Sequence, residues 1–243
     1  MDKLYRLIID KDGLNRIKPE ERAFFFALGH VANEINILNK QILWCSDFSS
    51  KSDHIIKGQI TLSQFSYRTL AGKLNEANEL IKTAFLSKKY AKSYVESFND
   101  NASETLKEIK KYFGSSNIVN KIRNNHSFHY SATNFSENLS GIPDDLEVFL
   151  HKTQGNSLYY ASEVIATMAM MKSCGSSDWS TLLNEIVSEL NGISKLMLSF
   201  SHEFMTEFVK KHSKVIVKNN PEPLELCDLP LLKEIQIPWF VAQ

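Results

Sequence analysis

The sequence has little of what breaks helices, binds zinc or anchors a chain in a bilayer. Nine Gly and six Pro are few for 243 residues, which favours helices over a turn-rich sheet fold. The three cysteines, Cys45, Cys174 and Cys227, are odd in number and far apart, so neither a zinc site nor a redox pair is indicated. We therefore expect a reducing, cytoplasmic compartment. No apolar run approaches the ~18 residues that span a bilayer, so membrane insertion is not expected.

A net charge is also missing from the sequence as a whole. Lys plus Arg and Asp plus Glu both number 28, so the chain shows no overall basic excess of the kind that binds polyanions. The local balance is different, because the stretch from Arg68 to His129 holds eleven basic residues against six acidic ones. Solvated helix faces account for many such charges. Any polyanion contact is therefore predicted on this stretch.

What the sequence has is apolar residues spaced three or four apart, which predicts an all-α fold. The predicted helices cover about 19–44, 65–94, 103–113, 116–130, 158–171 and 178–212. Pro19 suits the first turn of a helix, and Gly114 suits a helix end. Residues 46–58 are expected to form a loop, and four prolines after Asn219 predict an irregular C-terminal tail over about 213–243. Without a linker-like stretch, residues 1–243 are expected to form one domain with its core at about 19–212.

One segment gathers residues suited to phosphate chemistry, namely Arg123, Asn124, His126 and His129. On a helix that turns ~100° per residue, the Arg and both His fall on one slanting row. Histidine titrates near neutral pH and arginine grips phosphate oxygens in two places, so the set suits phosphodiester cleavage. The same residues would also form an ordinary polar helix end. A metal site is not expected, because no acidic or cysteine ligand follows at a fitting spacing.

The segment I-R-N-N-H-S-F-H-Y resembles the signature of the HEPN superfamily, in which a polar residue follows an Arg and a His comes after four to six intervening positions. Five residues intervene here, Asn124 fills the polar position, and two long predicted helices precede the motif. The resemblance extends over roughly Pro19 to Tyr130. It implies a HEPN-like bundle of long antiparallel helices.

The resemblance also implies a function, that of an endoribonuclease without metal or other cofactor, often a toxin of a toxin–antitoxin pair or a phage-defence effector. Such proteins act as homodimers in which two motifs meet. By position, Arg123, Asn124 and His129 would be the catalytic residues, with His129 taking the proton from a ribose 2′-hydroxyl and Arg123 stabilising the phosphoryl oxygens. His126 would be a second acid or base from its spacing alone. RNA would be the substrate, and an antitoxin or regulatory protein would be a partner.

Two other functions remain open at this point: a nucleotide- or RNA-binding helical module without turnover, and a structural or regulatory dimeric partner. An acidic side chain that reaches Arg123 would favour the ribonuclease, and Glu34, Glu76 and Glu79 are unranked candidates. Lys110, Lys111 and Lys121 are the cations predicted to contact RNA, since they precede the motif in the basic stretch.

Overall fold

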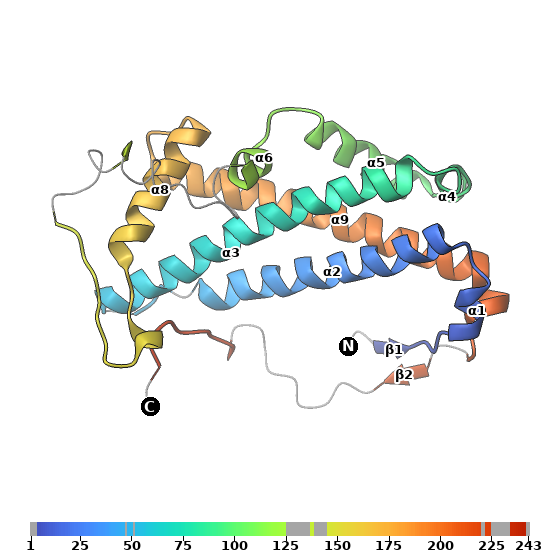
Figure 1. Cartoon of the computed structure of the whole chain (residues 1–243), viewed down its shortest axis with the longest axis horizontal. Helices are drawn as coiled ribbons and strands as arrows, with labels where there is room; N and C mark the ends of the chain where they lie inside the picture. The colour runs from blue at the N-terminus through green and yellow to red at the C-terminus, as the bar shows by residue number, and fades with distance from the viewer. Residues whose placement is uncertain are drawn as a thin grey trace.

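The computed structural model describes residues 4–46, 48–50, 52–124, 137–138, 145–219, 222–224 and 234–241, and these form an all-α fold with one short pair of strands (Figure 1). The predicted fold class is thereby confirmed. Within the described ranges, no helix is both long enough and apolar enough to cross a membrane.

Three long helices carry the fold: α2 (Pro19–Cys45), α3 (Asp53–Leu80) and α9 (Trp179–Ile216). Figure 1 shows α2 running antiparallel to the other two. Local chemistry explains two of the helix starts. Pro19 occupies the first turn of α2 with two acidic residues after it, and the Asp178 side chain accepts a hydrogen bond from Thr181 N at 2.7 Å at the start of α9.

Shorter segments complete the bundle. They are α1 (Lys11–Asn15), the π-helical turn η1 (Ile81–Leu86) that continues α3, α4 (Ala91–Ser97), α5 (Asp100–Phe113), α6 (Ile118–Ile122), the 3₁₀ turn η4 (Gln154–Asn156) and α8 (Tyr160–Cys174). α5 packs along α9, and α6 packs against α3, α8 and α9. α8 ends at Gly175, which has the left-handed conformation (φ 76°) that favours glycine.

Aromatic rings form the centre of the core. Phe204 of α9 is fully buried, with its ring centroid 4.8 Å from those of Phe24 and Tyr94 and 5.5 Å from that of Phe85. α2, η1, α4 and α9 therefore share one aromatic cluster, whose edge-to-face contacts add to the burial of apolar surface.

Two predicted boundaries around α3 are wrong. The helix begins at Asp53, so the expected loop over 46–58 is too long. Gly58, the last residue of the expected loop, instead lies within α3 and allows close packing: a Cβ atom on it would lie 2.6 Å from Cβ of Trp239. The second predicted helix does not continue to Tyr94 either. It ends with η1, and the chain turns before α4, because the Tyr90 hydroxyl bonds Ala84 O and the rings of η1 and α4 pack on α9.

The tail is more regular than predicted. α9 continues past His212 to Ile216, and β2 (Glu222–Leu224) pairs antiparallel with β1 (Leu4–Arg6). An ion pair of 2.5 Å between Arg6 and Glu222 joins the two strands. At the opposite end of the bundle, Val241 exchanges two hydrogen bonds with the Asn156 side chain, so the described parts of the tail contact both ends of the bundle (Figure 1).

Candidate functional site

α6 ends directly before Arg123, and a hydrogen-bonded turn sets where this helix begins. The buried Asn117 side chain accepts from Asn120 N at 2.8 Å, which caps the helix. The same side chain donates to Tyr112 O and Ser115 O at 3.1 and 2.9 Å, so the cap is tied to the end of α5. Ile118, Val119 and Ile122 then bury the apolar side of α6.

Glu189 of α9 fixes the same helix start from another direction. Its Oε2 accepts from the Tyr112 hydroxyl at 2.6 Å and from Ile118 N at 3.1 Å. A carboxylate at a helix start also complements the helix dipole. Burial, followed by the bond to Glu189, raises the pKa of Tyr112, so this hydroxyl remains a donor. α6 is thus held on the bundle by α5 and α9 together.

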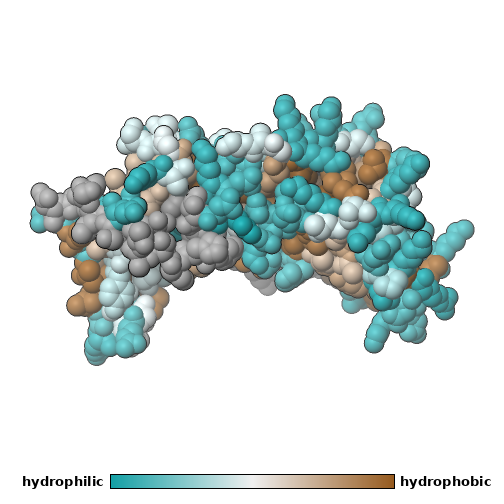
Figure 2. Space-filling model, turned by 45° about the horizontal axis from the view of Figure 1, so that its top comes forward, coloured by the Kyte–Doolittle hydropathy of each residue, from teal (hydrophilic) through white to brown (hydrophobic). Residues whose placement is uncertain are grey.

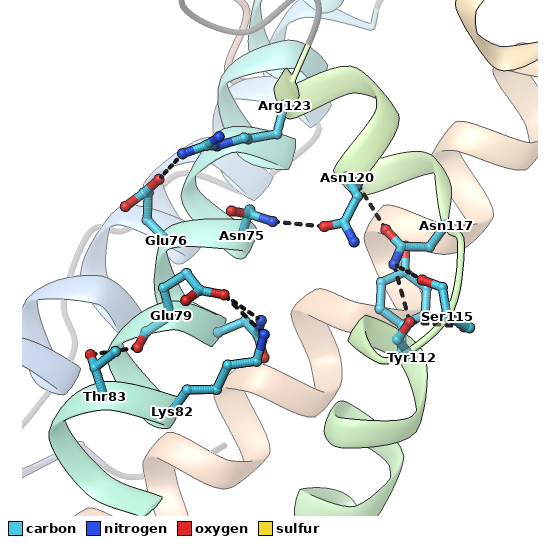
Figure 3. Close-up of polar contacts among 11 residues, drawn as sticks. Asn75, Glu76, Glu79, Lys82, Thr83, Tyr112, Ser115, Asn117, Asn120 and Arg123 are labelled. Atoms are coloured by element: carbon cyan, nitrogen blue, oxygen red, sulfur yellow. Dashed lines mark hydrogen bonds and ion pairs between the residues drawn. The ribbon is translucent and has the colours of Figure 1, made fainter. Parts of the chain in front are cut away.

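Arg123 follows α6 and reaches α3 (Figure 3). Its Nη2 lies 3.1 Å from Oε1 of Glu76, and its Nη1 donates to Oδ1 of Asn124 at 3.2 Å. One turn earlier, Asn75 Nδ2 donates to Asn120 Oδ1 at 2.7 Å. Arg123 and Asn124 continue the helix in a wider π-type turn, a form that is frequent at functional sites. Two predicted site residues, Arg123 and Asn124, are therefore in contact.

The three candidate acids now differ in their partners. Glu76 contacts Arg123, whereas Glu34 pairs with Lys73 at 2.6 Å and Glu79 pairs with Lys82 at 2.9 Å. The Arg123 and Glu76 side chains are 39% and 56% exposed, so their pair contributes at most about 1 kcal/mol to stability. Its main effect is to orient the guanidinium.

The predicted histidines, His126 and His129, lie outside the described residues, so the expected row with Arg123 stays a prediction. In the part of the chain that the structure describes, no three His, Cys, Asp or Glu side chains gather closely enough to hold a metal ion. The prediction of a site without metal concerns the undescribed histidines too, and it also stays a prediction.

The predicted RNA-contacting lysines divide into two groups. Lys110 and Lys111 are exposed in the last turn of α5, and neither forms an ion pair with a described residue. Lys121 of α6 is half-buried and donates to Cys174 O at 3.4 Å, at the end of α8. Figure 2 turns the α5 and α6 side of the bundle toward the viewer, and hydrophilic residues predominate on it.

Part of the basic excess is neutralised by acids from outside the stretch. Arg68 pairs with Glu163 of α8 at 3.0 Å, and Lys73 pairs with Glu34 of α2 at 2.6 Å. The polar contacts of Asn75, Asn120 and Glu189 were also missed from the sequence. No local pattern marks them, because each joins helices that are distant along the chain.

Comparison of the chain with protein-family models, curated proteins and solved structures finds no match. The resemblance to the HEPN superfamily accordingly stays a prediction from the motif. The chemistry of the site is that of an oriented guanidinium at the surface, held by a carboxylate and an amide. Such a group can bind a phosphate diester through charge-assisted hydrogen bonds.

Proposed function

We propose that this protein is a metal-independent endoribonuclease of HEPN type. The observation that carries the proposal is the contact of Glu76 with Nη2 of Arg123, together with the hydrogen bond from Nη1 of Arg123 to Asn124. This is the acidic partner that favours the ribonuclease over the two alternatives. An arginine held in position before substrate arrives loses less freedom on binding and can place its charge where the transition state needs it.

The proposed reaction is an internal transfer at phosphorus. His129 takes the proton of a ribose 2′-hydroxyl, the 2′-oxygen forms a bond to phosphorus, and the bond to the 5′-oxygen breaks. His126 returns a proton to the departing 5′-oxygen. Arg123 stabilises the negative charge on the phosphoryl oxygens. The products are a 2′,3′-cyclic phosphate and a 5′-hydroxyl, with no water consumed.

The direct test is to incubate the purified chain with mixed cellular RNA in a chelator and to analyse the fragment ends. Cyclic phosphate ends are expected. His129→Ala should lower the rate by about 10²- to 10⁴-fold with RNA binding retained, whereas Arg123→Ala should weaken both. Arg6→Ala is a matched control, because Arg6 also forms an exposed ion pair but lies in β1, away from α6.

Three outcomes would contradict the proposal. They are an unchanged rate in a folded His129→Ala variant, activity that disappears with chelator, and RNA binding without any fragments. The last outcome would favour a binding module. As a toxin or phage-defence effector, the active enzyme would need a neutralising partner, and loss of RNA cleavage when such a partner is added is the corresponding readout.

A further inference from the structure

A second polar cluster lies at the end of the bundle where α1, α4 and the last turns of α9 meet (Figure 1). Glu21, in the first turn of α2, is only 4% exposed. Its Oε1 accepts from the Tyr94 hydroxyl at 2.5 Å and from Lys211 Nζ at 3.0 Å, and it lies 2.8 Å from Nε2 of His212. One carboxylate oxygen thus joins α2, α4 and α9.

Ionisation of Glu21 decides the charge of this cluster. Burial raises the pKa of its carboxyl, but the bonds from Tyr94, His212 and Lys211 outweigh burial and bring the pKa below its ordinary value of 4.5. Glu21 is then a carboxylate at neutral pH, which can only accept, so Nε2 of His212 carries a proton.

A cavity of about 410 Å³ opens beside this carboxylate. Its polar lining comprises Arg16, Lys18, Glu21, Ser93, Lys211 and His212. Ile17 and Val215 add apolar wall. The volume lies toward the small end of the ~300–1,000 Å³ usual for ligand sites, which suits a molecule the size of a mononucleotide or sugar phosphate.

Two of the three cations in this lining have no carboxylate partner among the described residues. Arg16 and Lys18 form no ion pair with any described residue, whereas the nearby Lys210 and Lys218 pair with Glu207 and Asp10. Both Arg16 and Lys18 are exposed. Two positive charges therefore face the cavity without a carboxylate partner in the described part of the chain.

Lys211, the third cation of the lining, is held in place by its contacts. Its Nζ donates to Ser93 Oγ at 3.1 Å as well as to Glu21, and it lies 4.1 Å from the centroid of the Tyr94 ring. Glu20 also acts on this region, since after burial its charge raises the pKa of Tyr90. The lining itself holds three cations and one carboxylate, so even with the nearby charge of Glu20 its net charge is positive.

We propose that this cavity binds a small phosphate-bearing molecule, with Arg16, Lys18 and Lys211 contacting the phosphate. Arginine grips phosphate oxygens in pairs, and a tethered lysine adds a fixed point charge. Ile17 and Val215 contact the remainder of the ligand. This site is separate from Arg123, and it does not depend on ribonuclease activity.

Titration calorimetry of the full chain tests the proposal with inorganic phosphate, AMP and adenosine as probes. Phosphate and AMP should bind, and adenosine should not. If AMP binds more tightly than inorganic phosphate, the site is one for phosphate esters. If AMP and inorganic phosphate bind with equal affinity, the site is one for free phosphate. The Arg16→Gln/Lys18→Gln double variant should weaken binding by about tenfold or more, and both changes fall on exposed side chains.

The matched control is Lys40→Gln/Lys195→Gln, which removes two exposed lysines that pair with no described residue and do not line the cavity. Its affinity for phosphate should equal that of the parent. The proposal is wrong if neither phosphate nor AMP binds, if adenosine binds as well as AMP, or if the control pair weakens binding as much as the Arg16 and Lys18 changes.

Discussion

At the scale of single residues, Glu76 is the clearest addition to the predicted motif. Its carboxylate contacts the guanidinium of Arg123. Under the proposed function, this carboxylate would also lie close to the RNA phosphate that Arg123 binds. The two effects oppose each other. Removal of the negative charge should relieve repulsion of RNA and at the same time loosen the arginine.

Glu76→Gln should therefore bind RNA more tightly and cleave it more slowly, with a fall in kcat of about two- to fivefold that corresponds to the ~0.5–1 kcal/mol of an exposed pair. Glu76→Asp should be intermediate. Single-turnover cleavage and filter binding measure the two effects separately. Glu222→Gln is the control, since Glu222 forms a similar exposed pair with Arg6 but lies in β2, outside the basic stretch. Parallel losses of binding and stability in Glu76→Gln would instead indicate a structural role.

Glu21 allows a prediction about acid stability. Because the pKa of this carboxyl is lowered in the folded chain, its contribution to stability is full above the unfolded value near 4.5 and is lost as pH falls below it. Glu21→Gln should lower the free energy of unfolding by about 1–3 kcal/mol at pH 7, a loss limited by the partial exposure of Lys211, which can be rehydrated. The loss should be smaller at pH 3, because the advantage of the ionised carboxylate is reduced there. Urea unfolding at both pH values measures the difference. An equal loss at both would show that the charge does not matter.

At the scale of elements, α6 is a short helix that depends on its neighbours. Five residues make too few internal hydrogen bonds for a stable helix, so the Asn117 cap, Glu189 and the buried Ile and Val side chains hold it. The position of Arg123 thus depends on α5 and α9, which contribute no residue to the guanidinium contacts described above.

The end of α5 supplies the charges expected to contact RNA. Lys110→Glu/Lys111→Glu should weaken RNA binding and make it less sensitive to salt, because two exposed cations without ion pairs in the described ranges are lost. Lys40→Glu/Lys195→Glu is the control, because both lysines are exposed and lie outside the basic stretch from Arg68 to His129. Binding across a salt series is the measurement. Equal effects from both pairs would remove the reason to place RNA on the α5 and α6 side.

At the scale of the whole molecule, we expect two chains to pair. One exposed Arg with one carboxylate and one amide offers few groups to enclose a phosphate, so a composite site from two motifs near a symmetry axis is expected. Sedimentation over a concentration series should show a dimer at micromolar concentration. A monomer throughout, in a preparation that cleaves RNA, would contradict this.

Local rules were enough to predict much of the bundle. The start of α2 at Pro19, the end of α5 at Gly114 and the start of α9 after Asp178 follow from capping and periodicity, which act between residues a few positions apart. The end of the expected 46–58 loop was wrong because it was judged from local composition alone, whereas Gly58 packs against Trp239, which is far along the chain.

The sequence by itself therefore determined the all-α class, the starts of α2 and α9 and the presence of a helical segment ahead of Arg123. Only the tertiary structure decided that Glu76, and not Glu34 or Glu79, contacts Arg123, and that Glu21 meets Lys211 and His212. Such contacts depend on how helices cross, and the crossings are set by the packing of buried side chains from all of them at once. No local pattern carries that information.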